Sequence, residues 1–256
     1  EHTYSFTAAD KKGNITEKAV SVMIKKDSVK PELKVTDSAG QELKGLNGWY
    51  GKNEKISVKV KAGASGITEV TYAANGKTQT LGKAAANKEA EYTFTPMEGS
   101  YYSEIKAVSG SGVETTVAKT IQLDGTAPEN GCIKYVVKDS DAESEEDKSY
   151  TVESLADLAE DDDTLSVDIE VFVQDVLSGI ASIKAENLTF SSPKTVALDG
   201  KEGSYYEVTA TGLTVAQAKA LKVKATDIVG NVCDDVALEV ISKNSKVTKL
   251  GDIVAP

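Results

Sequence analysis

The stretch Ile56-Ser-Val-Lys-Val60, followed by Ser65-Gly66-Ile67, decides the fold of this chain. It recurs as Ile169-Glu-Val-Phe-Val173 followed by Ser178-Gly179-Ile180. The offset is 113 residues at both ends (169 − 56 and 178 − 65), so no gap separates the two copies. In the first copy apolar side chains alternate with polar ones, which is typical of a strand with one buried face. The chain therefore contains at least two copies of one β-rich unit.

Two further landmarks recur along the chain. The segment Ala8-Ala-Asp-Lys-Lys-Gly-Asn14 matches Ala225-Thr-Asp-Ile-Val-Gly-Asn231, and residues 107–113 are a degenerate copy with Ser in place of Asp. An Asp-x-x-x-Pro junction occurs at Asp27–Pro31 and again at Asp124–Pro128, 97 residues later. These landmarks mark where one unit ends and the next begins.

The landmarks divide the chain into four parts. Residues 1–27 are expected to be the last two strands of a preceding module, and residues 28–124 a complete module. Residues 125–243 are expected to form a second, larger module, with an acidic insertion near 140–165 that is interpreted as a solvated loop. Residues 244–256 are interpreted as a linker or the start of a further unit.

Strand and turn signals predict an all-β chain of antiparallel sandwiches. Strand patterns recur every 8–16 residues, and Asn75-Gly76 between two of them is a strong hairpin signal. The capping box Thr214-Val-Ala-Gln217 predicts a single helical turn in the last module. A second short helix is expected where Val152, Leu155 and Leu158 share one face.

These motifs resemble the tandem immunoglobulin-like repeats of bacterial secreted and cell-surface proteins. The resemblance rests on the A-x-D-x-x-G-N segments at 8–14 and 225–231, the Ser-Gly-Ile strings and the Asp-x-x-x-Pro junctions. It implies immunoglobulin-like antiparallel β-sandwiches arranged end to end, although a fibronectin III-like topology stays open. It also implies a non-catalytic stalk, spacer or adhesive region of an extracellular, cell-wall-attached protein. The short junctions with Pro31 and Pro128 favour an extended array.

Composition argues against several other classes of protein. Lys plus Arg number 29 and Asp plus Glu 40, so the net charge of 29 − 40 = −11 disfavours nucleic acid and anionic membranes. There is one histidine, His2, and there are two cysteines, too few for a Cys/His zinc site. We therefore expect no catalysis and no cofactor.

Four aspartates are the candidates for calcium ligands: Asp10 and Asp227 in the repeated turns, and Asp139 and Asp141 in the acidic insertion. For Asp10 and Asp227 the favoured interpretation is turn capping, because calcium needs six to eight oxygens from several segments. The acidic insertion lacks the central glycine of an EF-hand loop. The expectation is that no metal is needed for folding.

Cys132 and Cys233 lie on the expected first and last strands of the last module. Such strands are often neighbours in sandwiches, so a disulfide is one alternative. Two free, mostly buried thiols are the other and the favoured one, because the other modules have no cysteine at these places.

A second hypothesis concerns aromatic side chains. Trp49 and Tyr50, with Tyr101 and Tyr102, are candidates for a sugar-stacking surface, although packing in the core or at a strand edge is favoured. The chain would then be a carbohydrate- or host-protein-binding accessory region of a larger secreted glycoside hydrolase. The expected partners are a host glycan or protein, or none, and the expected state is a monomer.

Overall fold

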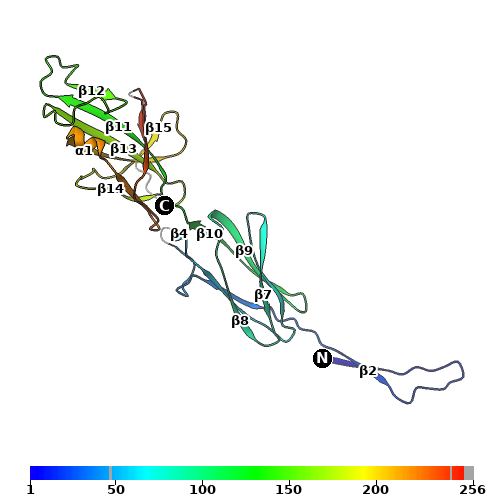
Figure 1. Cartoon of the computed structure of the whole chain (residues 1–256). Coiled ribbons are helices and arrows are strands. Elements are labelled where there is room, and N and C mark those ends of the chain that lie inside the picture. The colour runs from blue at the N-terminus through cyan, green and yellow to red at the C-terminus, as the bar shows by residue number, and fades with distance from the viewer. Residues whose placement is uncertain (46–47, 243, 251–256) are drawn as a thin grey trace. The chain divides into compact units, whose positions relative to one another are not determined.

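The computed structural model describes residues 1–45, 48–242 and 244–250, and their regular secondary structure is almost entirely β-strand (Figure 1). The chain divides into two compact units. Unit 1 contains residues 1–43, 54–97 and 101–121, and unit 2 contains residues 44–53, 98–100 and 122–256. No described helix is long and apolar enough to cross a bilayer. The elements are β1 (His2–Phe6), β2 (Val20–Ile24), β3 (Glu32–Thr36), β4 (Trp49–Gly51), β5 (Ile56–Lys61), β6 (Ile67–Ala74), β7 (Lys77–Ala84), β8 (Glu89–Phe94), β9 (Gly99–Ser109), β10 (Glu114–Asp124), β11 (Asn130–Asp139), β12 (Ser149–Val152), β13 (Leu165–Gln174), β14 (Ile180–Ala185), β15 (Lys194–Leu198), β16 (Tyr205–Leu213), α1 (Val215–Lys219), β17 (Val223–Asp227), β18 (Val232–Cys233), β19 (Ala237–Val240) and β20 (Val247–Lys249).

Strands β1 and β2 form an antiparallel two-stranded sheet of their own. Every residue of both strands is exposed, although Tyr4 and Phe6 alternate with polar residues as in a strand with one buried face. The alternation of apolar residues is thus present, but the described residues supply no second sheet to cover it. The assignment of residues 1–27 to a preceding module stays a prediction.

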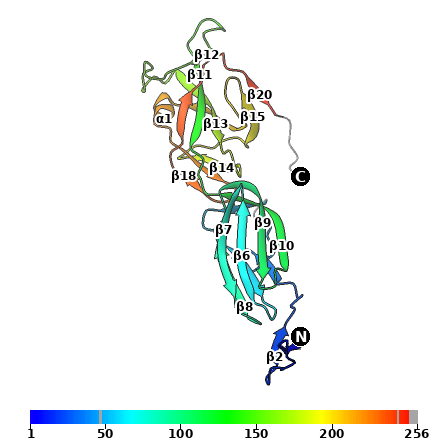
Figure 2. The ribbon, with the colours of Figure 1, turned by 90° about the vertical axis from the view of Figure 1, so that its right-hand side faces the viewer.

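The next strands form two antiparallel groups. One sheet has the order β3-β5-β8, and the other has the order β4-β10-β9-β6-β7. Figure 2 shows β7, β6, β9 and β10 of the second sheet side by side. The repeated strand β5 is central in the first sheet, where Val58 pairs with Val35 on one side and Tyr92 on the other. The predicted Asn75-Gly76 turn is confirmed, because both residues have positive φ and join β6 directly to β7. Among the described strands of these two sheets, β4 alone runs parallel to its partner, β10.

Buried side chains hold these two sheets together. Ile56, Val58 and Val60 are buried on β5, as predicted, while Lys59 between them is exposed. Tyr72 of β6 stacks on Phe94 of β8 with ring centroids 4.1 Å apart, which joins one sheet to the other. The arrangement is therefore sandwich-like, with an apolar layer between two sheets.

Unit 2 has a larger sheet with the order β12-β11-β13-β16-β15-β20, to which β19 adds by pairing parallel with β11. A second sheet has the order β14-β17-β18. The repeated strand β13 is again central, paired antiparallel with β11 and β16 (Figure 1). One core cluster takes side chains from both sheets, among them Ile169 and Val171 of β13, Ile183 of β14 and Ala225 of β17.

Strand β13 departs from simple alternation at its end. Ile169, Val171 and Val173 are buried as predicted, but Phe172 between them is buried too. It packs in a second, smaller cluster that contains Cys132 and Tyr205. Glu170, which points to the other face, is only partly exposed, and its carboxylate pairs with the Lys134 ammonium group at 3.5 Å.

Three local expectations in the last module have different outcomes. The helical turn is confirmed: α1 is capped by Thr214, and the capping box with Gln217 is complete. The second helix is wrong, because no helix lies between β12 and β13, and Leu155 reaches the core from a turn. The acidic insertion is a hairpin loop that continues into β12, which pairs with β11.

The tail, interpreted from the sequence as a linker or the start of a further unit, contains a short strand. Residues 247–249 form the edge strand β20, in which Val247 pairs with Leu198 of β15. Val247 also packs on the smaller core cluster of unit 2. Residues 251–256 lie outside the described residues.

Candidate metal centre

The Asp-x-x-Gly-Asn turn after β17 is held by its own side chains. Asp227 Oδ1 accepts the backbone N–H of Asn231 at 2.8 Å, and Asp227 Oδ2 accepts the Asn231 side-chain amide at 2.7 Å. Gly230 has φ +94°, a conformation that a residue with a Cβ adopts only with strain. The motif is therefore first of all a structural turn.

The other two copies of this turn have corresponding hydrogen bonds, two at Asp10 and one at Ser109. Asp10 accepts the Asn14 backbone N–H at 3.0 Å and the Asn14 side-chain amide at 2.7 Å. In the degenerate copy, Ser109 Oγ accepts the N–H of Val113 at 2.9 Å. These hydrogen bonds lower the pKa of Asp10, with the Asn14 backbone N–H as the largest cause. Turn capping is thus what the structure shows for Asp10 and Asp227.

Asp124 ends β10 and lies beside the turn of Asp227. Its Oδ1 accepts the backbone N–H of Thr126 at 3.1 Å, and its Oδ2 accepts the backbone N–H of Ser178 at 3.0 Å. The side-chain amide of Asn231 also donates to the Asp124 carbonyl at 3.1 Å. Neighbouring loops of unit 2 therefore hold this carboxylate in place.

Asp175 joins these residues from the loop after β13. Its Oδ1 accepts the backbone N–H groups of Leu177 at 3.1 Å and Gly179 at 2.8 Å. Burial raises the pKa of Asp175, and the nearby carboxylates of Asp124 and Asp227 raise it further, against the hydrogen bonds that lower it. The direction of this shift reflects first the burial of the carboxylate and second the negative charges beside it.

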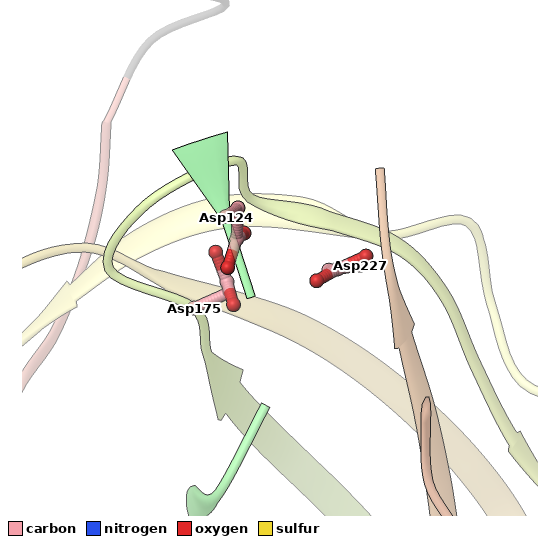
Figure 3. Close-up of side chains that lie close together, drawn as sticks. All are labelled: Asp124, Asp175 and Asp227. Carbon is pink, nitrogen blue, oxygen red and sulfur yellow. The ribbon is translucent and has the colours of Figure 1, made fainter. Parts of the chain in front are cut away.

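The three carboxylates form one cluster. One ligand oxygen from each of Asp124, Asp175 and Asp227 lies within 4.8 Å of the others. Asp124 is 0% exposed and Asp227 is 1% exposed, while Asp175 is partly exposed. Figure 3 shows Asp124 and Asp175 next to each other, with Asp227 across from them. An oxygen-only donor set of this kind suits hard cations such as Ca²⁺ or Mg²⁺ rather than zinc.

Sequence reasoning found only one member of this cluster. It named Asp227 as a calcium candidate and Asp124 as part of a junction, and it did not consider Asp175. A signal was present in the repeat: the position 113 residues before Asp175 is Ala62, so a carboxylate appears in only one copy (175 − 113 = 62). The convergence of the three segments is a tertiary feature that no local pattern contains.

The remaining calcium candidates lie elsewhere. Asp139 ends β11 and accepts the backbone N–H of Asp141 at 2.9 Å, and Asp141 is exposed. Among the described residues, neither belongs to a group of three acidic donors. Asp10, between β1 and β2, likewise belongs to no group of three acidic donors in the described part of the chain.

The two cysteines are free thiols in the structure. Cys132 is buried on β11, and burial raises its pKa, which disfavours the reactive thiolate. Cys233 lies on β18, in the other sheet of unit 2. The first strand does lie beside a late strand, as expected, but that strand is β19, and Cys132 is opposite Glu239 there.

The aromatic candidates have unequal exposure. Tyr50 is buried and its hydroxyl accepts the backbone N–H of Lys44 at 2.7 Å, and Trp49 is partly buried. On β9, Tyr101 is partly buried and Tyr102 is 67% exposed. Tyr102 is thus the member of the set with a face free for a ligand.

Comparison with protein families and curated proteins finds no relative of this chain. No protein-family model and no curated protein matches the chain. Its function must therefore be argued from the residues themselves.

Proposed function

We propose that this chain is a non-catalytic array of immunoglobulin-like modules that acts as a stalk, spacer or ligand-presenting region of an extracellular or cell-surface protein. The observation that carries the proposal is the equivalent strand order around β5 and β13. Each copy of the repeated strand is flanked by an earlier strand and by a later one, both antiparallel to it, as β3-β5-β8 and β11-β13-β16. Immunoglobulin-type sandwiches place strands A, B and E together in this way.

The second sheet of each module supports the same assignment. The strand that follows the repeat, β6 or β14, pairs with β9 or β17, and a last strand, β10 or β18, completes the order C-F-G. The parallel pairs β4–β10 and β11–β19 bring an early strand of each module beside a late one. The two modules, whose sequences match only at the repeated motifs, therefore have corresponding strand orders.

The non-catalytic part of the proposal rests on the chemistry that the chain carries. Its single histidine, His2, is exposed in the β1–β2 sheet, and its buried cysteine has a raised pKa. A depression of about 530 Å³ over β3, β5 and β8 is lined by strand surface, including the ion pairs Lys59–Glu91 and Lys61–Glu32 at 3.6 Å. Surface ion pairs of this kind are ordinary on exposed sheets.

Small-angle scattering of the full chain tests the array. The short junctions Asp27–Pro31 and Asp124–Pro128 favour modules joined in succession, so we expect a radius of gyration well above the ~18 Å of a compact chain of this length. A value near that of a compact globule would contradict the proposal. The proposed cell-surface location rests on the sequence resemblance.

A further inference from the structure

We propose that Asp124, Asp175 and Asp227 bind one calcium ion, with the Ser178 hydroxyl as a further oxygen ligand. The inference departs from the sequence expectation that folding needs no metal, and it goes beyond the proposed role as a module array. It assigns a ligand to a specific set of atoms in unit 2.

The charge of the cluster is the first step of the argument. Hydrogen bonds to the three carboxylates come from neutral N–H and O–H groups, of which the backbone N–H groups of Thr126 and Gly179 are examples. None of the ion pairs among the described residues joins a lysine to Asp124, Asp175 or Asp227. Buried carboxylates are normally paired with a cation or coordinate a metal, and three within 4.8 Å repel one another. A divalent cation removes this repulsion.

The second step is an orphaned hydroxyl beside the cluster. Ser178 is 7% exposed, and its Oγ has no hydrogen-bond partner. Its backbone N–H donates to Asp124 Oδ2 at 3.0 Å, which places the residue against the carboxylates. A buried hydroxyl without a partner is unfavourable, whereas a hydroxyl oxygen that coordinates a cation is satisfied.

The preceding module provides an internal comparison. There Ser65, the counterpart of Ser178, donates both its backbone N–H and its hydroxyl to Asp27 Oδ2, at 2.8 and 2.7 Å. The counterparts of Asp175 and Asp227 are Ala62 and Ser109, so this module has one carboxylate where the last has three. The serine hydroxyl thus bonds the aspartate where the extra carboxylates are absent, and is unpartnered where they are present.

The donor set favours calcium among the common divalent cations. It offers oxygens only, from three separate segments, and several of these oxygens already accept backbone N–H groups. Mg²⁺ demands near-ideal octahedral geometry and binds few protein ligands, whereas Ca²⁺ accepts six to eight oxygens in irregular arrangements. The ion would fix the end of β10 to the loop after β13 and to the turn after β17.

Calorimetric titration of calcium chloride into the chelator-treated full chain tests the proposal. We expect one saturable site per chain in the parent protein, and weaker binding of magnesium chloride in a matched titration. In Asp175→Asn the affinity should fall by at least ~10-fold, because a ligand carboxylate is lost. Asparagine keeps an oxygen that accepts the loop N–H groups, so this variant is designed to retain the fold.

Three further variants locate the site. Ser178→Ala should also weaken calcium binding, and it removes only a hydroxyl that has no partner in the protein. Asp10→Asn is the matched control for the turn motif, and Asp139→Asn/Asp141→Asn is the control for the acidic hairpin loop; both should bind calcium like the parent. The proposal is overturned by a parent protein that does not bind calcium, by unchanged affinity in Asp175→Asn, or by a loss of binding in the Asp139/Asp141 control. Magnesium binding as tight as calcium binding would overturn the choice of ion.

Discussion

Ser65 donates its backbone N–H and its hydroxyl to the same oxygen, Asp27 Oδ2, at 2.8 and 2.7 Å. The contact joins the first residue of the Asp-x-x-x-Pro junction to the turn between β5 and β6. These bonds lower the pKa of Asp27, with the Ser65 hydroxyl as the largest cause. Both motifs that recur in the sequence, the junction aspartate and the Ser-Gly-Ile serine, are thus the two ends of one contact.

This contact makes a pH-dependent contribution to stability. Because the folded-state pKa of Asp27 lies below its ordinary value of 3.8, the carboxylate stabilises the fold above that value. The contribution is lost as the pH falls from 3.8 through the lower folded-state pKa. We therefore expect Ser65→Ala to be less stable than the parent at neutral pH, with the difference shrinking in strong acid. Urea unfolding at neutral pH and in strong acid measures the difference in stability between the two proteins. A difference that is as large in acid as at neutral pH would contradict the assignment.

Asp175 should behave in the opposite way in the absence of calcium. Its folded-state pKa is raised by burial and by Asp124 and Asp227, so its ionised form is disfavoured by folding at neutral pH. Asp175→Asn should therefore raise the melting temperature of the metal-free protein, and a given calcium concentration should raise it further by less than in the parent. The gain should shrink as the pH falls toward 3.8, where the parent carboxyl group takes up a proton. A metal-free variant less stable than the parent would mean that the ionised carboxylate is needed for the turn.

The preceding module should gain a calcium site when it receives the missing ligands. Ala62→Asp/Ser109→Asp places carboxylates at the counterparts of Asp175 and Asp227, beside Asp27. We expect calorimetry to count two calcium ions per chain in this variant and one in the parent. The single variant Ser109→Asp is the control and should bind one. An unchanged count in a folded double variant would show that the cluster needs more than these three positions.

The glycine of the repeated turn should be sensitive to substitution. Gly230 has φ +94°, and no atom lies within 4 Å of the position that a Cβ would take. Gly230→Ala should therefore destabilise unit 2 through backbone strain, by about 1–3 kcal/mol. Gly125→Ala is the control, because Gly125 is not among the positive-φ residues and its added Cβ would meet Glu98 at an ordinary 3.4 Å. Equal stabilities of the two variants in urea would contradict the argument.

The parts of the fold that sequence predicted are those with a local cause. The burial of Ile56, Val58 and Val60, the Asn75-Gly76 turn and the capping box at Thr214 each depend on residues a few positions apart, and each is confirmed. The alternation itself is incomplete, because Ser57 is buried too. The predicted helix over 152–158 is wrong because Leu155 reaches the core from a turn instead of a helical face. Propensity and spacing do not contain that tertiary contact.

The candidate site was beyond local reasoning for a similar reason. In the sequence, Asp124 and Asp175 are more than fifty residues apart, and so are Asp175 and Asp227. Each of the three lies in its own turn and accepts hydrogen bonds from its own N–H donors. The sequence marked two of them as parts of repeats. Their proximity follows from how β10, β13 and β17 are placed, which the motifs do not specify. Partial burial of Glu170 against Lys134 was missed in the same way.

The proposed array consists of two complete modules with separate cores, one around β5 and one around β13. Val60 and Val171 occupy these cores, and both are buried. Differential scanning calorimetry of the parent, Val60→Ala and Val171→Ala should show more than one unfolding transition. Each variant should lower one transition and leave the other in place, because each creates a cavity that costs about 2–4 kcal/mol in its own core. A single two-state transition that both substitutions lower together would contradict the account.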